Sequence, residues 1–495
     1  MADAEIDNHA ASALADPSLF RQTAYIGGEW AASRTGNTFD VINPATDEKI
    51  GVVPRMSANE AAEAVRQAED AFAGWRATLA KDRAKLLRRW AELINENKED
   101  LALLVTLEQG KPLAEARGEV GASAASIEWF AEEAKRAYGD VIPHNMSDRR
   151  LLVTKEPIGV CAAITPWNFP SAMVARKCAP ALAAGCTIVL KPAEQTPFSA
   201  LALAALAERA GIPKGVFNVI TGDAQEIGEA LTSSSTVRKL SFTGSTAVGA
   251  KLMANCAPTL KKLSLELGGN APFIVFDDAN IDQAVESAMV SKFRNSGQTC
   301  VCTNRFLIQD GIYDAFVEKF AAAIRGQLKI GNGLEESISQ GPLIDRRAVA
   351  KVEGLIDDAV SLGARLKLGG KRHGDVGCYF EPTLLTDVTP KMRLAKEEIF
   401  GPLAPVFRFK DEEEAIGLAN DTEYGLAAYV HTRDVSRTWR IGEALECGMV
   451  GFNVGAFSTE EAPFGGVKHS GFGREGSKYG LDEYLDVKYW CVGGI

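Results

Sequence analysis

The sequence lacks three features that would each suggest a class of protein: paired cysteines, a long apolar run and an excess of basic residues. Its nine cysteines are irregularly spaced, and none forms the CxxC pair of a structural zinc site. This pattern excludes a small disulfide-stapled module. It predicts reduced thiols, no bound metal and a cytoplasmic location.

The longest apolar stretch, about residues 179–190, contains Pro180 and Gly185 and is shorter than the ~18 residues that a membrane span needs. The first twenty residues are polar and acidic, unlike a signal or transit peptide. The 54 Lys and Arg residues against 65 Asp and Glu residues leave a net charge of -11. We therefore expect neither nucleic acid nor membrane as a partner, and an anionic ligand must be held by local cations.

What the sequence does contain is the composition of a large globular protein. Its 495 residues are 46% hydrophobic and 24% charged, which is apolar enough to bury sizeable cores. The length predicts about three folding units. No internal repeat or low-complexity segment is present.

Two kinds of periodicity divide the chain. Apolar residues recur at helical spacing over 59–79 and 83–107, which predicts a helical N-terminal part. Short apolar runs then alternate with amphipathic stretches, which predicts a parallel α/β sheet. The predicted strands are 158–164, 186–190, 216–220, 237–242, 262–267 and 272–276, and the predicted helices are 199–210, 224–232 and 245–256.

A second alternating set runs from about Arg305 to residue 450 and predicts another α/β unit, with the boundary near Gly268 and Gly269. The segments 139–157 and 482–495 resemble strands but have no neighbouring helix to cover them. Such strands often pair with each other or with another subunit.

The most informative segment is residues 291–302, SKFRNSGQTCVC. Gly, Gln and Thr precede Cys300 where a helix is expected to end, and a thiol on such a loop can be reactive. Free cysteines are also among the most buried residues in proteins, so the thiol alone favours an inert core position. Only its surroundings distinguish the two interpretations.

A carboxylate at a strand end is the second candidate. In residues 261–269, period-two alternation puts Leu263, Leu265 and Leu267 on one face and Glu266 on the other. Burial among apolar neighbours raises the pKa of a carboxyl group, as a general base requires. A salt-bridged glutamate fits the same pattern. The glycine pair that follows favours a site, because it lets backbone approach a ligand.

Two strand-to-helix turns are candidates for binding a nucleotide. Gly244 and Ser245 follow one predicted strand and open a helix, whose free N–H groups can bind phosphate. This is not the GxGxxG fingerprint, and a simple turn explains it equally well. Lys191 and Glu194 end another strand and can hydrogen-bond ribose hydroxyls, although Lys-Pro is also common in surface turns.

Seven motifs together resemble the NAD(P)-dependent aldehyde dehydrogenases, in order and spacing from about residue 20 onward. They are WNFP (167–170), KPAE (191–194), FTGS (242–245), ELGGN (266–270), GQTC (297–300), EEIFGP (397–402) and PFGGVKHSG (463–471). Within that family the chain is most similar to the succinate-semialdehyde dehydrogenases, through KFRNSGQTCVC, the Arg176 of SAMVARK and GREGSKYG (473–480).

The resemblance implies an α/β fold of the aldehyde dehydrogenase type, with a Rossmann-type cofactor domain, an α/β catalytic domain and a small β arm for oligomerisation. Its domains are residues 1–138 with 158–268 for the dinucleotide, 269–450 for catalysis, 139–157 with 482–495 for the arm, and 451–481 returning to the cleft. A homodimer or homotetramer is implied.

Carried over by position, the resemblance makes Cys300 the nucleophile, Glu266 the general base and Asn168 the side-chain donor to the oxyanion. It implies supporting roles for Lys177 and Glu475. The residues that it places at the cofactor are Thr165, Trp167, Asn168, Lys191, Glu194, Gly222, Gly244, Ser245, Leu267, Glu398 and Phe400.

The implied substrate is a short aldehyde that ends in a carboxylate, succinate semialdehyde first and glutarate semialdehyde second. The resemblance places Arg176, Arg294 and Ser458 on that carboxylate. Arg176 is expected two helical turns after Asn168, and Arg294 precedes Cys300 by six residues. Both arginines are therefore expected to line one tunnel.

Glu194 predicts that NAD is preferred and NADP remains usable. Its carboxylate accepts hydrogen bonds from a ribose 2′-hydroxyl and repels a 2′-phosphate, while Lys191 softens the repulsion. Cys302 predicts a reversible disulfide with Cys300, since residues two apart on a flexible loop can reach bonding distance. The alternative is that Cys302 packs against the sheet.

Two other classes stay open on sequence alone. A Cys-Glu amidohydrolase would use the same thiol and carboxylate, but it leaves the Gly244 turn and the Lys191 and Glu194 pair without a role. A non-catalytic relative is opposed by the presence of Cys300 and Glu266.

Overall fold

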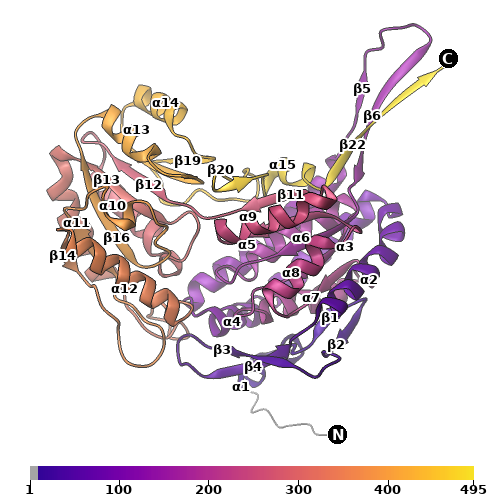
Figure 1. Cartoon of the computed structure of the whole chain (residues 1–495), viewed down its shortest axis with the longest axis horizontal. Coiled ribbons are helices and arrows are strands. Elements are labelled where there is room, and N and C mark those ends of the chain that lie inside the picture. The colour runs from indigo at the N-terminus through magenta and orange to yellow at the C-terminus, as the bar shows by residue number, and fades with distance from the viewer. Residues whose placement is uncertain (1–8, 495) are drawn as a thin grey trace.

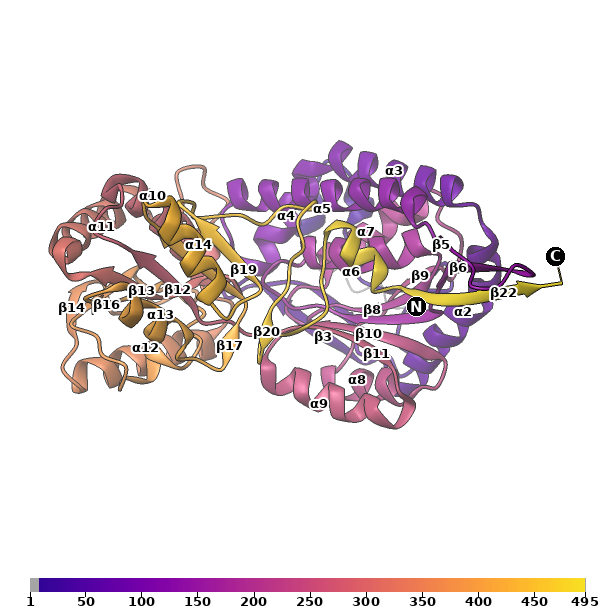
Figure 2. The ribbon, with the colours of Figure 1, turned by 90° about the horizontal axis from the view of Figure 1, so that it is seen from above.

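The computed structural model describes residues 9–494, so the acidic residues 1–8 discussed above lie outside the described part of the chain. Two open α/β sheets lie side by side, and a thin β arm projects from one of them (Figures 1 and 2). This arrangement confirms the predicted α/β fold.

The N-terminal part is helical, as the periodicity predicts. A short helix α1 (His9–Ser12) and two hairpins, β1 (Ala24–Ile26) with β2 (Glu29–Ala31) and β3 (Thr38–Ile42) with β4 (Lys49–Pro54), precede it. Its long helices are α2 (Ala58–Ala77), α3 (Ala80–Glu96), α4 (Lys98–Gln109) and α5 (Leu113–Glu133).

The helical pattern over 83–107 is divided between two helices rather than one. Asn97 leaves helical geometry between α3 and α4, and its side-chain amide donates to the Leu93 carbonyl at 2.8 Å. An asparagine side chain that competes for backbone hydrogen bonds in this way commonly ends a helix.

The first sheet has the strand order β2-β1-β9-β8-β7-β10-β11-β21, and its five central strands are parallel. Those strands are β7 (Val160–Ile164), β8 (Thr187–Lys191), β9 (Phe217–Val219), β10 (Val237–Thr243) and β11 (Lys262–Glu266). The helices between them are α6 (Ala172–Ala184), α7 (Phe198–Arg209), α8 (Ala224–Ser233) and α9 (Thr246–Cys256). Each predicted strand and helix bound in this region falls within two residues of the observed one.

Alternate residues of the central strands enter two different cores. Cys161 and Ala163 of β7 pack with α3 to α7, whereas Val160 and Ala162 pack with α2, α8 and α9 on the opposite face (Figure 2). Such two-sided burial explains why these strands are continuous apolar runs in the sequence.

The second sheet has the order β14-β15-β16-β13-β12-β18-β19 and is parallel except at the β14 edge. Its strands are β12 (Ala271–Val275), β13 (Thr303–Gln309), β14 (Arg365–Leu368), β15 (Thr383–Thr386), β16 (Leu403–Phe409), β18 (Ala427–His431) and β19 (Met449–Phe452). The helices that cover it are α10 (Ile281–Phe293), α11 (Tyr313–Gln327), α12 (Arg346–Ser361), α13 (Glu412–Asn420) and α14 (Val435–Ala444).

The chain crosses from the first sheet to the second through residues 267–270, which contain the glycine pair. It returns later, because β21 (Gly471–Phe472) pairs antiparallel with β11. A small ladder, β17 (Tyr424–Gly425) with β20 (Val467–Lys468), and helix α15 (Ser477–Asp482) complete the return. The carboxyl ends of β10 and β11 therefore face the second sheet across a cleft.

The arm consists of β5 (Asp140–Ile142), β6 (Arg149–Pro157) and β22 (Leu485–Gly493), which form a separate antiparallel sheet (Figure 1). Large apolar side chains are exposed on it, including Val141, Val487, Tyr489 and Trp490. Exposed apolar strands of this kind are typical of subunit contacts. The expected homodimer or homotetramer stays a prediction.

Within residues 9–494, no helix has both the length and the apolar character to cross a membrane. The same residues contain no group of three His, Cys, Asp or Glu side chains placed to hold a metal ion.

Candidate active site

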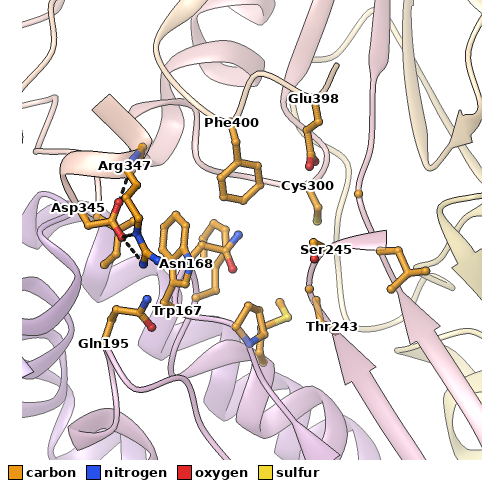
Figure 3. A pocket seen from close by; sticks show the side chains of 18 of the residues that line it. Trp167, Asn168, Gln195, Thr243, Ser245, Cys300, Asp345, Arg347, Glu398 and Phe400 are labelled. Atoms are coloured by element: carbon orange, nitrogen blue, oxygen red, sulfur yellow. Dashed lines mark hydrogen bonds and ion pairs between the residues drawn. The ribbon is translucent and has the colours of Figure 1, made fainter. Parts of the chain in front are cut away.

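A cavity of about 370 Å³ opens in the cleft between the two sheets (Figure 3). The loop after β7 contributes Trp167 and Asn168, the turn after β10 contributes Gly244 and Ser245, and Leu267 follows β11. The second sheet supplies the other wall. Its contributions are Cys300, Glu398 and Phe400, together with Arg347 and Lys351 of α12.

A smaller cavity of about 100 Å³ also reaches Cys300. It is lined by Phe169, Arg176, Arg294, Ser458 and Phe464, among others. Cys300, with Phe169 and Met173, lies where the larger cavity meets the smaller one. A nucleophile at such a junction can contact a ligand in each cavity at once.

Cys300 is only partly exposed, and its pKa is raised to about 12. Burial is the main cause and the charge of Glu266 is the next. The resting thiol is therefore protonated near neutral pH. It must lose its proton to a base before it can act as a nucleophile.

The loop before Cys300 has an unusual backbone. Asn295 and Ser296 both have left-handed dihedral angles, with φ of 52° and 56°, and Gly297 follows with φ of 76°. A Cβ on Gly297 would lie 2.2 Å from the Gly401 carbonyl oxygen, so only glycine fits. Consecutive left-handed non-glycine residues are costly and tend to occur at functional sites. Sequence reasoning did not find this strain.

Glu266 ends β11 and is 3% exposed. Neither of its carboxylate oxygens has a hydrogen-bond partner among the described residues. Its pKa is well above the usual value, first because of burial and next because of the charge of Glu475. Lys177 is bonded to Glu475 at 2.6 Å, which leaves the Glu266 carboxyl free to take a proton.

Asn168 lies in the loop after β7, and its side-chain amide donates to the Gln298 carbonyl at 3.0 Å. The expected two helical turns between Asn168 and Arg176 are wrong, because α6 begins only at Ala172. Pro170 explains the difference, since the residue before a proline is disfavoured in helical geometry. Both residues nevertheless reach the region of Cys300.

The larger cavity fits a dinucleotide in its charge pattern and in its aromatic walls. Ser245 caps the N-terminus of α9, and a Cβ on Gly244 would lie 2.4 Å from the Phe242 ring, so the turn stays narrow. Trp167 and Phe400 meet edge to face at 5.5 Å (Figure 3). Free N–H groups at a helix start suit phosphate, and aromatic walls suit a flat ring.

Glu398 points into the same cavity, where its carboxylate accepts from the Gly269 N–H at 2.9 Å (Figure 3). Burial raises its pKa to about 7. A carboxylate fixed in this way can accept hydrogen bonds from ribose hydroxyls.

Lys191 and Glu194 do not line the larger cavity. Lys191 is buried and pairs with Glu194 at 3.2 Å, while Glu194 lines an adjoining cavity beside Gln195. Gln195 lines both cavities, so they are continuous at that point. Glu194 thus lies where the groove extends beyond Gln195, whereas Lys191 lines neither cavity.

Two further residues expected at the cofactor lie behind the groove. Thr165 is buried, and its N–H donates to the Lys191 carbonyl at 3.1 Å. Gly222, which follows β9, forms an isolated parallel β-bridge with Met56. Their contacts support the walls of the groove.

Cys302 is 3% exposed and lies against Lys292, whose Nζ donates to its Sγ at 3.4 Å. Burial raises the pKa of this thiol. The contact with Lys292 is compatible with the alternative in which Cys302 packs against the sheet. The disulfide with Cys300 stays a prediction.

Sequence reasoning missed several residues that line the two cavities. Gln195, Thr243, Arg347 and Lys351 line the larger one, and Phe169 lines both. Gln195 directly follows the KPAE motif, which was the one available signal. Arg347 and Lys351 lie on an ordinary amphipathic helix, and nothing local marks them.

Two α/β sheets that face a long groove, with a cysteine where that groove meets a small cavity, are the arrangement expected of a dehydrogenase that uses a thiol. The chain belongs to the aldehyde dehydrogenase family, whose profile matches residues 30–490.

Several relatives of this chain are semialdehyde dehydrogenases, and one at 61% identity is the 3-sulfolactaldehyde dehydrogenase of Pseudomonas putida. It is 62% identical to the glutarate-semialdehyde dehydrogenase of Pseudomonas aeruginosa, over 97% of this chain and 100% of that protein. It is 61% identical to the NADP(+) succinate-semialdehyde dehydrogenase of Escherichia coli, over 97% and 99%. A crystal structure of an Escherichia coli NADP-dependent enzyme superposes with a TM-score of 0.96 at 61% identity, covering 97% and 100%.

Proposed function

We propose that this protein oxidises a short aldehyde with a terminal carboxylate to the corresponding acid, with NAD or NADP as the oxidant. Succinate semialdehyde is the first candidate and glutarate semialdehyde the second, and relatives are named for each. One observation carries the proposal: two arginines line the small cavity beside Cys300, and neither guanidinium group forms an ion pair with a described residue.

Both guanidinium groups are held by aromatic rings instead of carboxylates. Arg176 lies 4.4 Å from the centroid of the Phe464 ring, and Arg294 lies 5.0 Å from that of Phe169. Neither guanidinium group forms an ion pair or a hydrogen bond with a described residue, although the charge of Arg294 acts on Glu115 and that of Arg176 on Glu266. In an acidic protein, two unpaired arginines in one cavity favour an anionic ligand, which the planar fork binds bidentately.

The roles of the three catalytic residues follow from their surroundings. Cys300, once deprotonated, attacks the aldehyde carbon, and the resulting oxyanion accepts hydrogen bonds from the Cys300 N–H and the Asn168 amide. Glu266 is the charged group that raises the pKa of the Cys300 thiol most, so the two side chains act on each other within one site. A nicotinamide cofactor, when bound, supplies the acceptor for the hydride that leaves the former aldehyde carbon.

The second half of the reaction releases the acid. The oxidised carbon is held on Cys300 as a thioester, which water must cleave. Glu266 takes a proton from that water as it adds to the thioester carbon, and the thiol is then regenerated. A buried carboxylate with a raised pKa is a strong base for this step, because its neutral form is favoured.

The dinucleotide would contact five residues that line the groove: Trp167, Ser245, Leu267, Glu398 and Phe400. Ser245 and the start of α9 would hold the diphosphate, and Glu398 the nicotinamide ribose. Lys191 and Glu194 would hold the adenosine ribose at the far end of the groove.

Replacement of either arginine is expected to weaken binding of the semialdehyde and to leave binding of a neutral aldehyde nearly unchanged. Arg176→Ala and Arg294→Ala should each raise KM for succinate semialdehyde tenfold or more, on the order of the 1.5–3 kcal/mol of a charged hydrogen bond. The neutral aldehyde butanal, which has no carboxylate to lose, should be affected less than threefold. Initial rates of cofactor reduction give the KM for each aldehyde. A valid signal must require both the aldehyde and the cofactor.

Arg325→Ala, at an exposed position of α11, is the matched control and should leave both KM values unchanged. Equal losses with the two aldehydes would contradict the carboxylate-tail proposal. So would a kcat/KM for butanal above that for succinate semialdehyde in the unmutated enzyme.

We further propose that NAD is preferred over NADP because of Glu194, with the preference limited by Lys191 at 3.2 Å. Glu194→Ser should remove the repulsion of a 2′-phosphate and raise the ratio of kcat/KM for NADP to that for NAD at least tenfold. Titration of both cofactors at saturating aldehyde measures the ratio. Glu413→Ser, at an exposed position of α13, controls for net charge. Comparable kcat/KM for the two cofactors in the unmutated enzyme would show that Glu194 does not contact the ribose.

A further inference from the structure

Three charged residues at the junction of α4 and α5 lie beneath both catalytic loops. Lys111 precedes α5, and Glu115 and Glu119 lie one turn apart on its first half. The Lys111 side chain is 0% exposed and pairs with Glu119, 1% exposed, at 2.5 Å. We call these three residues the α5 charge cluster. A buried ion pair is costly to desolvate, so its contacts require an explanation.

One side of the α5 charge cluster holds the loop that carries Asn168. The Lys111 Nζ donates to the Asn168 carbonyl at 2.7 Å and lies 3.9 Å from the centroid of the Phe169 ring. Glu119 accepts from the N–H groups of Ser171 at 2.9 Å and Ala172 at 3.2 Å. The peptide of Asn168 and the start of α6 are thus fixed to one ion pair.

The other side of the cluster holds the strained loop before Cys300. The Glu115 carboxylate accepts from the Asn295 N–H at 2.8 Å. The Asn295 amide in turn donates to the Asn168 carbonyl at 3.0 Å. That carbonyl therefore receives two donors, one from Lys111 and one from the Cys300 loop, and it links the two loops.

We propose that Lys111 is a positioning residue that sets the oxyanion donor. By fixing the Asn168 peptide, it aims the Asn168 side-chain amide at the oxyanion formed on Cys300. This inference rests on the proposed role of Asn168. The amide already reaches the Cys300 loop, where it donates to the Gln298 carbonyl at 3.0 Å. A donor displaced by about 1 Å loses much of its effect on rate.

Three readouts separate this role from a merely structural one. Lys111→Met should lower kcat tenfold or more while the Kd for NAD, measured by quenching of protein fluorescence, changes less than twofold. Alkylation of Cys300 by iodoacetamide forms no oxyanion, so its rate should change less than twofold. In the Asn168→Ala background, Lys111→Met should lower kcat less than twofold further, because the donor it positions is absent.

Lys239→Met is the matched control, since Lys239 is also 0% exposed and bonds to Ser264 and Glu483 outside the cavities. It should lower the thermal midpoint comparably and leave kcat within twofold. If Lys111→Met does not fold, Glu119→Gln replaces it in the same double-mutant cycle with Asn168→Ala. This variant keeps the size of the side chain and one acceptor.

Additive losses in the double variant, with Asn168→Ala itself impaired, would overturn the positioning role alone and leave the proposed function standing. Loss of the alkylation rate in Lys111→Met would also overturn it, because the whole Cys300 loop would then be disturbed. An unchanged kcat in Asn168→Ala would overturn the role of Asn168, and the inference with it.

Discussion

Cys300→Ala is expected to abolish aldehyde oxidation, with kcat reduced on the order of ten-thousandfold or more, because no other group can form the covalent intermediate. The alanine lacks the sulfur on which both the oxidation and the hydrolysis steps depend. Steady-state reduction of cofactor with succinate semialdehyde measures the loss. Binding of the cofactor, followed by protein fluorescence, should be retained.

Cys447→Ala provides the matched control for this prediction. Cys447 is also partly buried, and its Sγ hydrogen-bonds to the Met449 carbonyl. It lies just before β19 of the second sheet and lines neither of the two cavities at Cys300. Its replacement should leave kcat within twofold. Activity in Cys300→Ala near that of the unmutated enzyme would disprove the assignment of the nucleophile.

The elements of the first sheet were predictable because their strands are buried on both faces. The runs at β7, β8 and β10 are short, continuous and separated by amphipathic helices, so the pattern is unambiguous. Periodicity did not predict helix α6, and the helix expected between Asn168 and Arg176 begins only at Ala172. Its residues are buried nearly all round, so they show no amphipathic face, and Pro180 lies within it.

The seven motifs predicted which residues are the catalytic candidates, but they did not predict the surroundings of those residues. Each motif is a local string, and local strings indicate which loop follows which strand. Asn295, one of the two left-handed residues, donates its N–H to Glu115, which is 180 residues away. The contact of Lys111 with Asn168 likewise spans 57 residues. No periodicity reports contacts of that kind.

Charge pairing was also beyond the sequence. The chain contains 65 acidic residues, so a partner for any arginine was easy to suppose. Only the arrangement of side chains shows that Lys177 takes Glu475, which leaves Glu266 without a hydrogen bond, and that Arg176 and Arg294 stack on rings instead. These three side chains, Glu266, Arg176 and Arg294, are therefore available to interact with a ligand.

Glu266→Gln is expected to separate the two halves of the reaction. Hydrolysis of the thioester should slow by about a hundredfold or more, the usual contribution of a general base. Oxidation before it should be impaired less, so rapid mixing should reveal a burst of about one reduced cofactor per active site, followed by a slow steady state. Glu108→Gln is the matched control, because Glu108 is also a buried carboxyl with a raised pKa but caps α7 through Ser199.

The same variant should lose a specific dependence on pH. Burial, and next the charge of Glu475, raise the pKa of Glu266 well above its ordinary value, so its ionised fraction, which is the form that acts as a base, grows at higher pH than for an ordinary carboxyl group. As the pH rises, that fraction grows, and steady-state kcat of the unmutated enzyme should rise with it while hydrolysis limits turnover. A glutamine cannot ionise, so the rise should be absent in Glu266→Gln. A variant with no burst and no turnover would instead show that Glu266 is required to deprotonate Cys300, and an unchanged kcat would remove it from the mechanism altogether.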